Sequence, residues 1–285
     1  MESVAWLFLI LGGLLIGLTL GLTGSGGSIL TVPVLVYLVG HPDKVAIAES
    51  MLIVGAIAIA TVIPYAKAGE TDWIRVLGFG LPGILGTLLG KFASDQIDGS
   101  LLLIIFGGIV LGSAAWMLRG KTGDVAPDDQ TAPETLQSAT KKEASRIIFA
   151  TIGQGVGVGF MTGLIGVGGG FLIVPALVLF AKLPMRRAVG TSLAIISINS
   201  TSGFLFQFPR LQQALAAPNS TFTLNQLIAT TLIFVSIGIA GSFWGRKLSS
   251  NINQAKLRRG FAVFLLFMGS LILLIELQNL SPIAF

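Results

Sequence analysis

The chain carries the same glycine-rich stretch twice, as Gly21-Leu-Thr-Gly24-Ser-Gly26-Gly27-Ser28 and as Gly163-Leu-Ile-Gly166-Val-Gly168-Gly169-Gly170. Each stretch lies between two apolar segments, and glycine clusters favour unwound helix because glycine lacks a Cβ. Backbone groups that leave a helix at membrane depth must be buried in protein or line a polar cavity, since each unpaired group costs several kcal/mol in hydrocarbon. The two stretches therefore predict two broken helices at equivalent positions. Tight helix packing or a sharp turn is the alternative role of these glycines.

The surroundings of the two stretches are related as well. An offset of 142 aligns residues 21–55 with 163–197 without a gap, and 14 of these 35 positions are identical. At an offset of 155, Gly86-Thr-Leu-Leu-Gly90-Lys91 aligns with Gly241-Ser-Phe-Trp-Gly245-Arg246. We place the roughly 13 extra residues of the second half in the segment FQFPRLQQALAAPNS, which we expect to be a loop. The alignment predicts two related halves.

The composition points to a membrane protein. Of the 285 residues, 53% are hydrophobic and 11% are charged, whereas about 25% of residues are charged in an average soluble domain. Ten apolar segments follow in two sets of five, at about 3–22, 29–40, 45–66, 73–93, 100–118, 146–165, 171–182, 187–206, 223–244 and 257–279. We expect an all-α polytopic membrane protein with repeat 1 in 1–119, a polar cytoplasmic linker in 120–145 and repeat 2 in 146–285.

The basic residues predict the topology. An odd number of elements per half makes the second half enter the membrane from the opposite side, which is the inverted-repeat plan of many secondary transporters. If the linker is cytoplasmic, 15 of the 18 lysines and arginines lie inside and only Lys44, Lys91 and Arg210 lie outside. This is a strong positive-inside bias, and it places both termini outside. Because the basic residues lie in short loops, their charge indicates topology and no nucleic-acid partner.

Two of the ten segments are too short to cross the bilayer. The segments 29–40 and 171–182 have about 12 residues each, while a span needs about 20. We expect each to be a half-helix or re-entrant segment, although the sequence does not distinguish a re-entrant from a spanning segment. A half-helix that begins just after a break directs its positive dipole end and free N–H groups at an anion.

Polar side chains follow each break. The next segments begin Ala46-Ile-Ala-Glu49-Ser50 and Ala188-Val-Gly-Thr191-Ser192, and Asn199 shares a helix face with Ser192. Such a stripe suits a cavity wall, although the hydroxyls could equally bond the preceding turn or a neighbouring helix. The predicted substrate-binding residues are Gly24, Ser25, Gly26, Gly27, Ser28, Ser50, Gly166, Gly168, Gly169, Gly170, Thr191, Ser192 and Asn199.

One further residue concerns coupling. Glu49 is the one acid that we consider for H+ or Na+ coupling, because carboxylates inside a membrane tend to be functional. Its position four residues into the segment also allows it to reach the interface. We expect Glu276 to be interfacial and His41 to be solvated in a loop. Gly86, Gly90, Gly241 and Gly245 form small-residue packing motifs.

The residue inventory bears on other classes of function. The chain has no cysteine and one histidine, which leaves no disulfide and no usual Cys/His zinc cluster. It also has no nucleophile–base pair and no His-Glu-x-x-His motif. We therefore expect no enzyme activity, no metal and no cofactor. The partners expected are a small anion, the lipid bilayer and a coupling ion, and a homo-oligomer is compatible with the sequence.

The repeated pattern Gly-x-Gly-Gly-(Gly/Ser)-x-x-x-x-Pro-x-Leu, followed by a helix that opens Ala-x-x-Thr-Ser, resembles the sulfite exporter TauE/SafE family, also called TSUP. The second copy, with Gly166, Pro175 and Ser192, fits closely, while the first departs at Ser28 and Glu49. The resemblance covers nearly the whole chain apart from the linker. It implies a cell (inner) membrane transporter of small sulfur-containing anions such as sulfite, sulfonates or related organosulfur acids, driven by an ion gradient. Because members differ in substrate and direction, both stay open.

Three interpretations follow from the sequence. The first is alternating-access transport of a small oxyanion, with the two breaks meeting near the membrane midplane at a pseudo-symmetric site. The second is an anion channel of the same architecture. The third is a membrane assembly protein without transport activity.

Overall fold

The computed structural model describes residues 2–119, 141–165, 170–179, 181, 183–216, 223–250 and 252–280. Within them the chain forms ten α-helices and one π-helical segment, and no strand. In chain order these are α1 (Glu2–Thr23), α2 (Gly26–Pro33), η1 (Val34–Val39), α3 (Asp43–Lys67), α4 (Trp73–Asp95), α5 (Gly99–Arg119), α7 (Lys141–Ile165), α8 (Gly170–Leu179), α9 (Met185–Ala216), α10 (Leu224–Ser250) and α11 (Gln254–Leu280). The predicted all-α class is confirmed.

Six of the described helices are long and apolar enough to cross a membrane, namely α3, α4, α5, α9, α10 and α11. Charged residues are concentrated toward the ends of these helices, where a bilayer exposes side chains to water and headgroups. Large apolar side chains such as Leu85, Leu232 and Phe267 are exposed on the outer faces of the helices. An exposed apolar surface of this extent fits lipid, so the chain is a multi-pass membrane protein.

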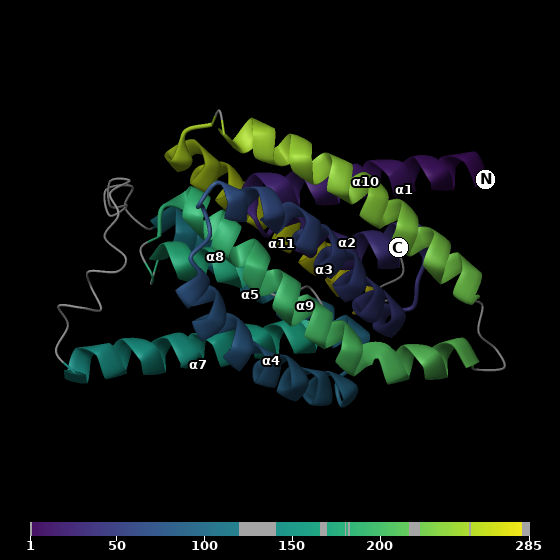
Figure 1. Cartoon of the computed structure of the whole chain (residues 1–285). Helices are drawn as coiled ribbons and strands as arrows, with labels where there is room; N and C mark the ends of the chain where they lie inside the picture. Colours follow the sequence, from purple (N-terminus) through teal and green to yellow (C-terminus); the bar gives the residue numbers. More distant parts are fainter. Residues whose placement is uncertain are drawn as a thin grey trace.

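The helices are arranged in layers. In Figure 1, α1 and α10 lie along the upper edge, α4 and α7 lie along the lower edge, and the remaining helices fill the space between. The central helices α3 and α9 pack against each other, as do α5 and α11. One apolar core runs through the molecule and includes Phe79 of α4, Phe106 of α5 and Phe261 of α11. The two short helices α2 and α8 lie inside this core.

Glycine lets the α1–α10 pair approach closely. A methyl group at Gly17 would lie 2.0 Å from the carbonyl oxygen of Gly238, and one at Gly245 would lie 2.2 Å from that of Leu18. No side chain fits at these points, and small residues are what allow helix backbones in membranes to pack at such distances. The packing role predicted for Gly245 is confirmed, and Gly241 meets the carbonyl oxygen of Leu14 in the same way.

The α4–α7 pair repeats this contact. A methyl group at Gly86 would lie 2.1 Å from the carbonyl oxygen of Val156, and one at Gly90 would lie 2.0 Å from that of Phe160. In the opposite direction, a methyl group at Gly159 would lie 2.1 Å from the carbonyl oxygen of Gly83. The packing role predicted for Gly86 and Gly90 is therefore confirmed as well.

Two boundaries differ from those expected. The prediction of a loop for the segment FQFPRLQQALAAPNS is wrong up to residue 216, because α9 continues through Pro209 to Ala216. An interior proline costs a helix about 3 kcal/mol, but Leu211 on the extension is buried against Val45 and Leu227, and this packing offsets the cost. In addition, α7 begins at Lys141, so the last five residues of the predicted linker 120–145 are helical. Residues 120–140 lie outside the described part.

Candidate functional site

The first break lies between α1 and α2. Gly24 has a backbone φ of +76°, a conformation that disfavours other residues, and it turns the chain so that α2 starts at Gly26. Two of the N–H groups expected to be free are bonded, since that of Gly26 donates to Thr23 Oγ1 at 3.0 Å and that of Ser28 donates to the Ser25 carbonyl at 3.2 Å. The break is confirmed, and the prediction of free donors is wrong for these two residues.

The second break lies between the end of α7 at Ile165 and the start of α8 at Gly170. The predicted site residues Gly166, Gly168 and Gly169 lie outside the described residues. A methyl group at Gly170 would lie 3.0 Å from Ser25 Cβ, 3.1 Å from Ser28 Oγ and 2.5 Å from Ile196 Cδ1. The first turns of the two short helices are therefore in contact in the protein interior, and Ser28 and Gly170 are equivalent at the offset of 142.

Neither short segment can cross a bilayer as a straight helix. The segment Gly26–Val39 and the helix Gly170–Leu179 would extend about 21 Å and 15 Å at 1.5 Å per residue, against a hydrocarbon thickness of about 30 Å. Both are surrounded by protein, as the complete burial of Leu35 and Ile173 shows. The expected short length of both segments is confirmed.

The helix α9 forms one wall of the junction. Ser192 Oγ lies 3.1 Å from the Gly24 carbonyl oxygen and 2.8 Å from that of Val189, and it can donate its proton to either. The neighbouring Thr191 Oγ1 accepts a hydrogen bond of 2.9 Å from the Asp72 N–H. The two predicted residues on α9 thus hold the first break and the loop before α4 in place.

Several other hydroxyls of the predicted site bond their own turn. Ser28 Oγ donates to the Ser25 carbonyl at 2.6 Å, and Ser50 Oγ donates to the Ile47 carbonyl at 2.8 Å. For these two residues the structure shows the alternative stated above, in which the hydroxyl bonds the preceding turn. The Ser25 hydroxyl differs, because it is fully buried and has no hydrogen-bond partner among the described residues.

A stripe of buried amides extends along α9 beyond Ser192. Asn199 is 1% exposed, and neither its Oδ1 nor its Nδ2 has a partner within the described part of the chain. Two turns further on, Gln207 is equally buried and equally unpartnered. Native proteins pair almost all buried polar groups, so groups left open in this way mark a place for a solute or water. Gln207 was missed in the sequence, although its spacing from Asn199 fits the same face.

Glu49 is buried and paired. It is 0% exposed, its Oε2 lies 2.5 Å from Nδ1 of His41, and its Oε1 accepts a hydrogen bond of 3.2 Å from Thr231 Oγ1. The expectation of a solvated His41 is wrong, since this side chain is 4% exposed, and the interfacial alternative for Glu49 is excluded with it. No local signal joins His41 to Glu49, because the turn after η1 is what folds the imidazole back over α3.

Glu276 is a second buried acid. It is 2% exposed and accepts a hydrogen bond from the Tyr37 hydroxyl of η1. The expected interfacial position is wrong, because η1 covers this part of α11. Glu276 lies apart from the glycine breaks, and it therefore provides a comparison for Glu49.

The similarities to known proteins agree with this architecture. A family model described as "Sulfite exporter TauE/SafE" matches residues 9–272. The chain belongs to this family. A "Probable membrane transporter protein" of Xylella fastidiosa (strain 9a5c) is 38% identical over 185 residues, which cover 65% of this chain and 67% of that protein. The "Probable membrane transporter protein YunE" of Bacillus subtilis (strain 168) is 27% identical over 261 residues, or 88% and 89% of the two chains. No solved structure matches the chain.

The TauE/SafE membership makes this chain a membrane transporter and not an enzyme. A transporter must carry a solute past its own apolar core, and polar groups inside that core are costly unless they serve this purpose. In this TauE/SafE protein such groups follow α9 from Ser192 to Gln207, starting at the junction of the two breaks.

Proposed function

We propose that this TauE/SafE protein is a secondary transporter that moves a small sulfur-containing oxyanion, such as sulfite or a sulfonate, by alternating access. The observation that carries the proposal is the contact of Gly170 with Ser25 and Ser28. It brings two short helices together by their amino ends, and helix amino ends favour anions. The substrate site is then formed by these two starts and by the α9 face with Ser192 and Asn199.

Uncharged donors would bind the substrate. The described residues at the junction include no lysine or arginine, whereas the Ser25 hydroxyl and the Asn199 amide have donors without partners. A site of this kind holds an oxyanion through hydrogen bonds and releases it more readily than an arginine would. The junction is closed at Gly170, where even a methyl group has no room. A substrate can therefore reach the junction only after helices move. This favours alternating access over a continuous pore.

Matching contacts in the two halves support the inverted repeat. Gly17 of α1 meets the carbonyl oxygen of Gly238 in α10, and Gly159 of α7 meets that of Gly83 in α4. These residues are equivalent at the offsets of 142 and 155. Each half therefore gives one helix to a pair in which the partner comes from the other half. We infer two halves related by a pseudo-two-fold axis, as alternating-access transporters with inverted repeats require.

The ion pairs support the proposed orientation. Lys91 and Arg210, both assigned to the outside, bind the same carboxylate of Asp95. Arg186 and Arg246, both assigned to the cytoplasm, line one cavity. Loops assigned to one side of the membrane thus meet at one end of the molecule. We propose a location in the inner membrane with both termini outside and the 120–145 linker in the cytoplasm.

We propose Glu49 and His41 as the coupling pair, with H+ as the coupling ion. A carboxylate and an imidazole 2.5 Å apart, both buried, can exchange a proton without crossing water. The pair lies at the start of α3, the helix that packs against α9. Loss or gain of a proton there changes the charge buried beside the moving helices, and charge burial is costly enough to bias a conformational equilibrium.

The transport proposal is tested with purified protein in liposomes, by following sulfite entry with and without a pH gradient. We expect saturable flux that the gradient stimulates. Glu49→Gln should remove the stimulation but retain sulfite exchange at equal pH, while the buried acid variant Glu276→Gln should keep both. Flux that never saturates would support a channel, and flux in Glu49→Gln that responds normally to pH would overturn the coupling role.

A further inference from the structure

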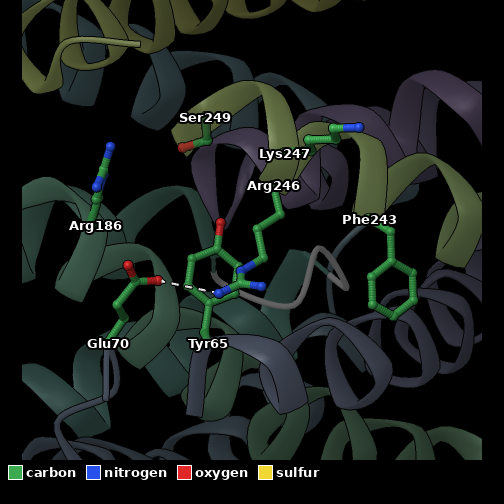
Figure 2. Close-up of a pocket in the computed structure, with 7 residues that line it drawn as sticks. All are labelled: Tyr65, Glu70, Arg186, Phe243, Arg246, Lys247 and Ser249. Carbon is green, nitrogen blue, oxygen red and sulfur yellow. Dashed lines mark ion pairs between the residues drawn. The ribbon is translucent and has the colours of Figure 1, made fainter. Parts of the chain in front are cut away.

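A separate cavity opens where α3 and α10 end and α9 begins (Figure 2). Its volume is about 300 Å³, which is room for about ten waters at roughly 30 Å³ each. Among the described residues, three cations line it, Arg186, Arg246 and Lys247, together with one acid, Glu70. They come from the start of α9, the end of α10 and the loop after α3, and in Figure 2 the Arg246 guanidinium lies over Tyr65 and faces Glu70, while Lys247 extends away from them. The lining therefore carries an excess of positive charge.

Arg246 is positioned but not saturated. Its guanidinium lies over the ring of Tyr65, with Cζ 4.8 Å from the ring centroid, and this cation–π contact fixes the direction of the side chain. The nearest carboxylate oxygen, Glu70 Oε2, is 3.7 Å from Nη2, which is beyond hydrogen-bond length. Glu70 thus balances the charge of Arg246 without occupying its donors. A small oxyanion in the cavity would offer those donors a shorter contact.

Two sets of contacts connect the lining of the cavity to the junction of the breaks. The loop that carries Glu70 packs on the first turns of α9, since a methyl group at Gly190 would lie 2.2 Å from the Glu70 carbonyl oxygen. From Arg186, Ser192 is six residues along α9, or about 9 Å. On the other side, the Tyr65 hydroxyl donates to the Gly21 carbonyl at 2.8 Å, in the last turn of α1 before its break.

We propose that this cavity is an oxyanion-capture site, which takes the substrate from the cytoplasm before it enters the junction of the breaks. The proposal rests on the transport function proposed above. Clefts lined mainly by one sign of charge concentrate counter-ions, and guanidinium groups recognise planar or tetrahedral oxyanions through paired donors. Glu70 acts as an internal competitor, because its nearby negative charge partly balances that of Arg246 and repels an incoming anion. The site thereby captures anions without retaining them.

The same cationic groups would suit the phosphate of an anionic lipid. A lipid could approach from the side, because Phe243 at the cavity and Trp244 beside it are exposed apolar side chains on α10. The experiment therefore has two arms. In the first, binding of inorganic sulfate and of sulfite to the full chain is measured by calorimetry in a neutral detergent. In the second, binding of the same protein to vesicles with and without phosphatidylglycerol is compared.

We expect Arg246→Gln to weaken oxyanion binding at least tenfold and Glu70→Gln to tighten it several-fold, a gain that misfolding cannot produce. The matched control is Arg210→Gln, which also removes an arginine from a carboxylate but at the opposite end of the molecule, and it should bind as the wild type does. Equal binding by the wild type and Arg246→Gln would overturn the capture site alone. A wild type that binds neither anion would overturn the transport proposal with it. Dependence on Arg246 for phosphatidylglycerol but not for sulfate or sulfite would assign the cavity to lipid and overturn capture.

Discussion

Replacing Asn199 by leucine separates a functional from a structural role for the buried stripe on α9. The two side chains have the same number of non-hydrogen atoms and the same branching, so the substitution mainly removes polarity. The equivalent position in the first half, at the offset of 142, is Ile57, and it is fully buried. An apolar side chain is therefore compatible with this place in the architecture.

The expected effect on stability follows from the missing partners. Neither amide atom of Asn199 is bonded within the described residues, and each buried unsatisfied group costs about 1–3 kcal/mol. Removing both should stabilise the protein by at least 1–3 kcal/mol. For a chain of this length, that is a rise in melting temperature on the order of 2–10 °C. Sulfite binding should fall by about tenfold or more, because a substrate hydrogen bond contributes a comparable energy.

The assay combines thermal melting in detergent with sulfite flux in liposomes. Asn199→Leu should melt higher and transport less, which is the opposite of what general damage produces. The control is Ser202→Ala on the same helix, whose hydroxyl bonds the Ile198 and Asn199 carbonyls of its own turn and which should leave flux unchanged. A variant Asn199→Leu that melts lower than the wild type and transports sulfite at the normal rate would refute the reasoning.

Two pairs of substitutions, each with one variant at the first break and one control elsewhere, test the geometry of that break. Gly24→Ala should lower the free energy of unfolding by more than the about 1–2 kcal/mol that a positive φ costs, because a methyl group would also lie 2.7 Å from Ser192 Oγ. The control is Gly40→Ala, which has a φ of +80° and open space around it. It should show the cost of the positive φ alone in the same melting experiment. Ser192→Ala removes the hydroxyl that lies between the Gly24 carbonyl of the first break and the Val189 carbonyl of its own turn, and it should destabilise by about 1 kcal/mol. Ser197→Ala removes a bond within one helix and should shift the melting temperature less, and the reverse order would contradict the assigned contacts.

Local features of the sequence predicted the elements whose cause is local. Glycine breaks a helix and lets backbones approach wherever it stands, so both the break at Gly24 and the packing at Gly86 could be predicted from residue type and repeat position. The shared face of Ser192 and Asn199 likewise follows from helical periodicity alone. Each of these features is determined by the residues of a single helix, so it can be predicted without knowing which segment packs against that helix.

The remaining features depend on contacts between distant segments. The burial of His41 arises when the turn after η1 brings it onto Glu49, and Thr231 joins the pair from α10. The extension of α9 beyond Pro209 depends on Leu211 meeting Leu227. A proline in a stretch of mixed polar and apolar residues predicts a loop when viewed alone, because the compensating packing comes from residues that are remote in the chain. The sequence alone did not show whether the serine and threonine hydroxyls bond their own turn or a neighbouring helix, because that choice also depends on contacts between distant segments.

Cross-linking the two breaks tests the central claim most directly. Because the chain has no cysteine, the variant Ser25→Cys with Gly170→Cys carries only the two introduced thiols. A methyl group at Gly170 would lie 3.0 Å from Ser25 Cβ, which is about 0.5 Å below the Cβ separations of roughly 3.5–4.5 Å found in disulfides, so a small outward shift of one helix start gives disulfide geometry. We predict that mild oxidation forms the bond, that a sulfonate, which unlike sulfite does not cleave disulfides, slows its formation, and that the bonded protein stops transporting the sulfonate until it is reduced. A folded variant that never forms the bond, or that transports normally with the bond in place, would contradict the account.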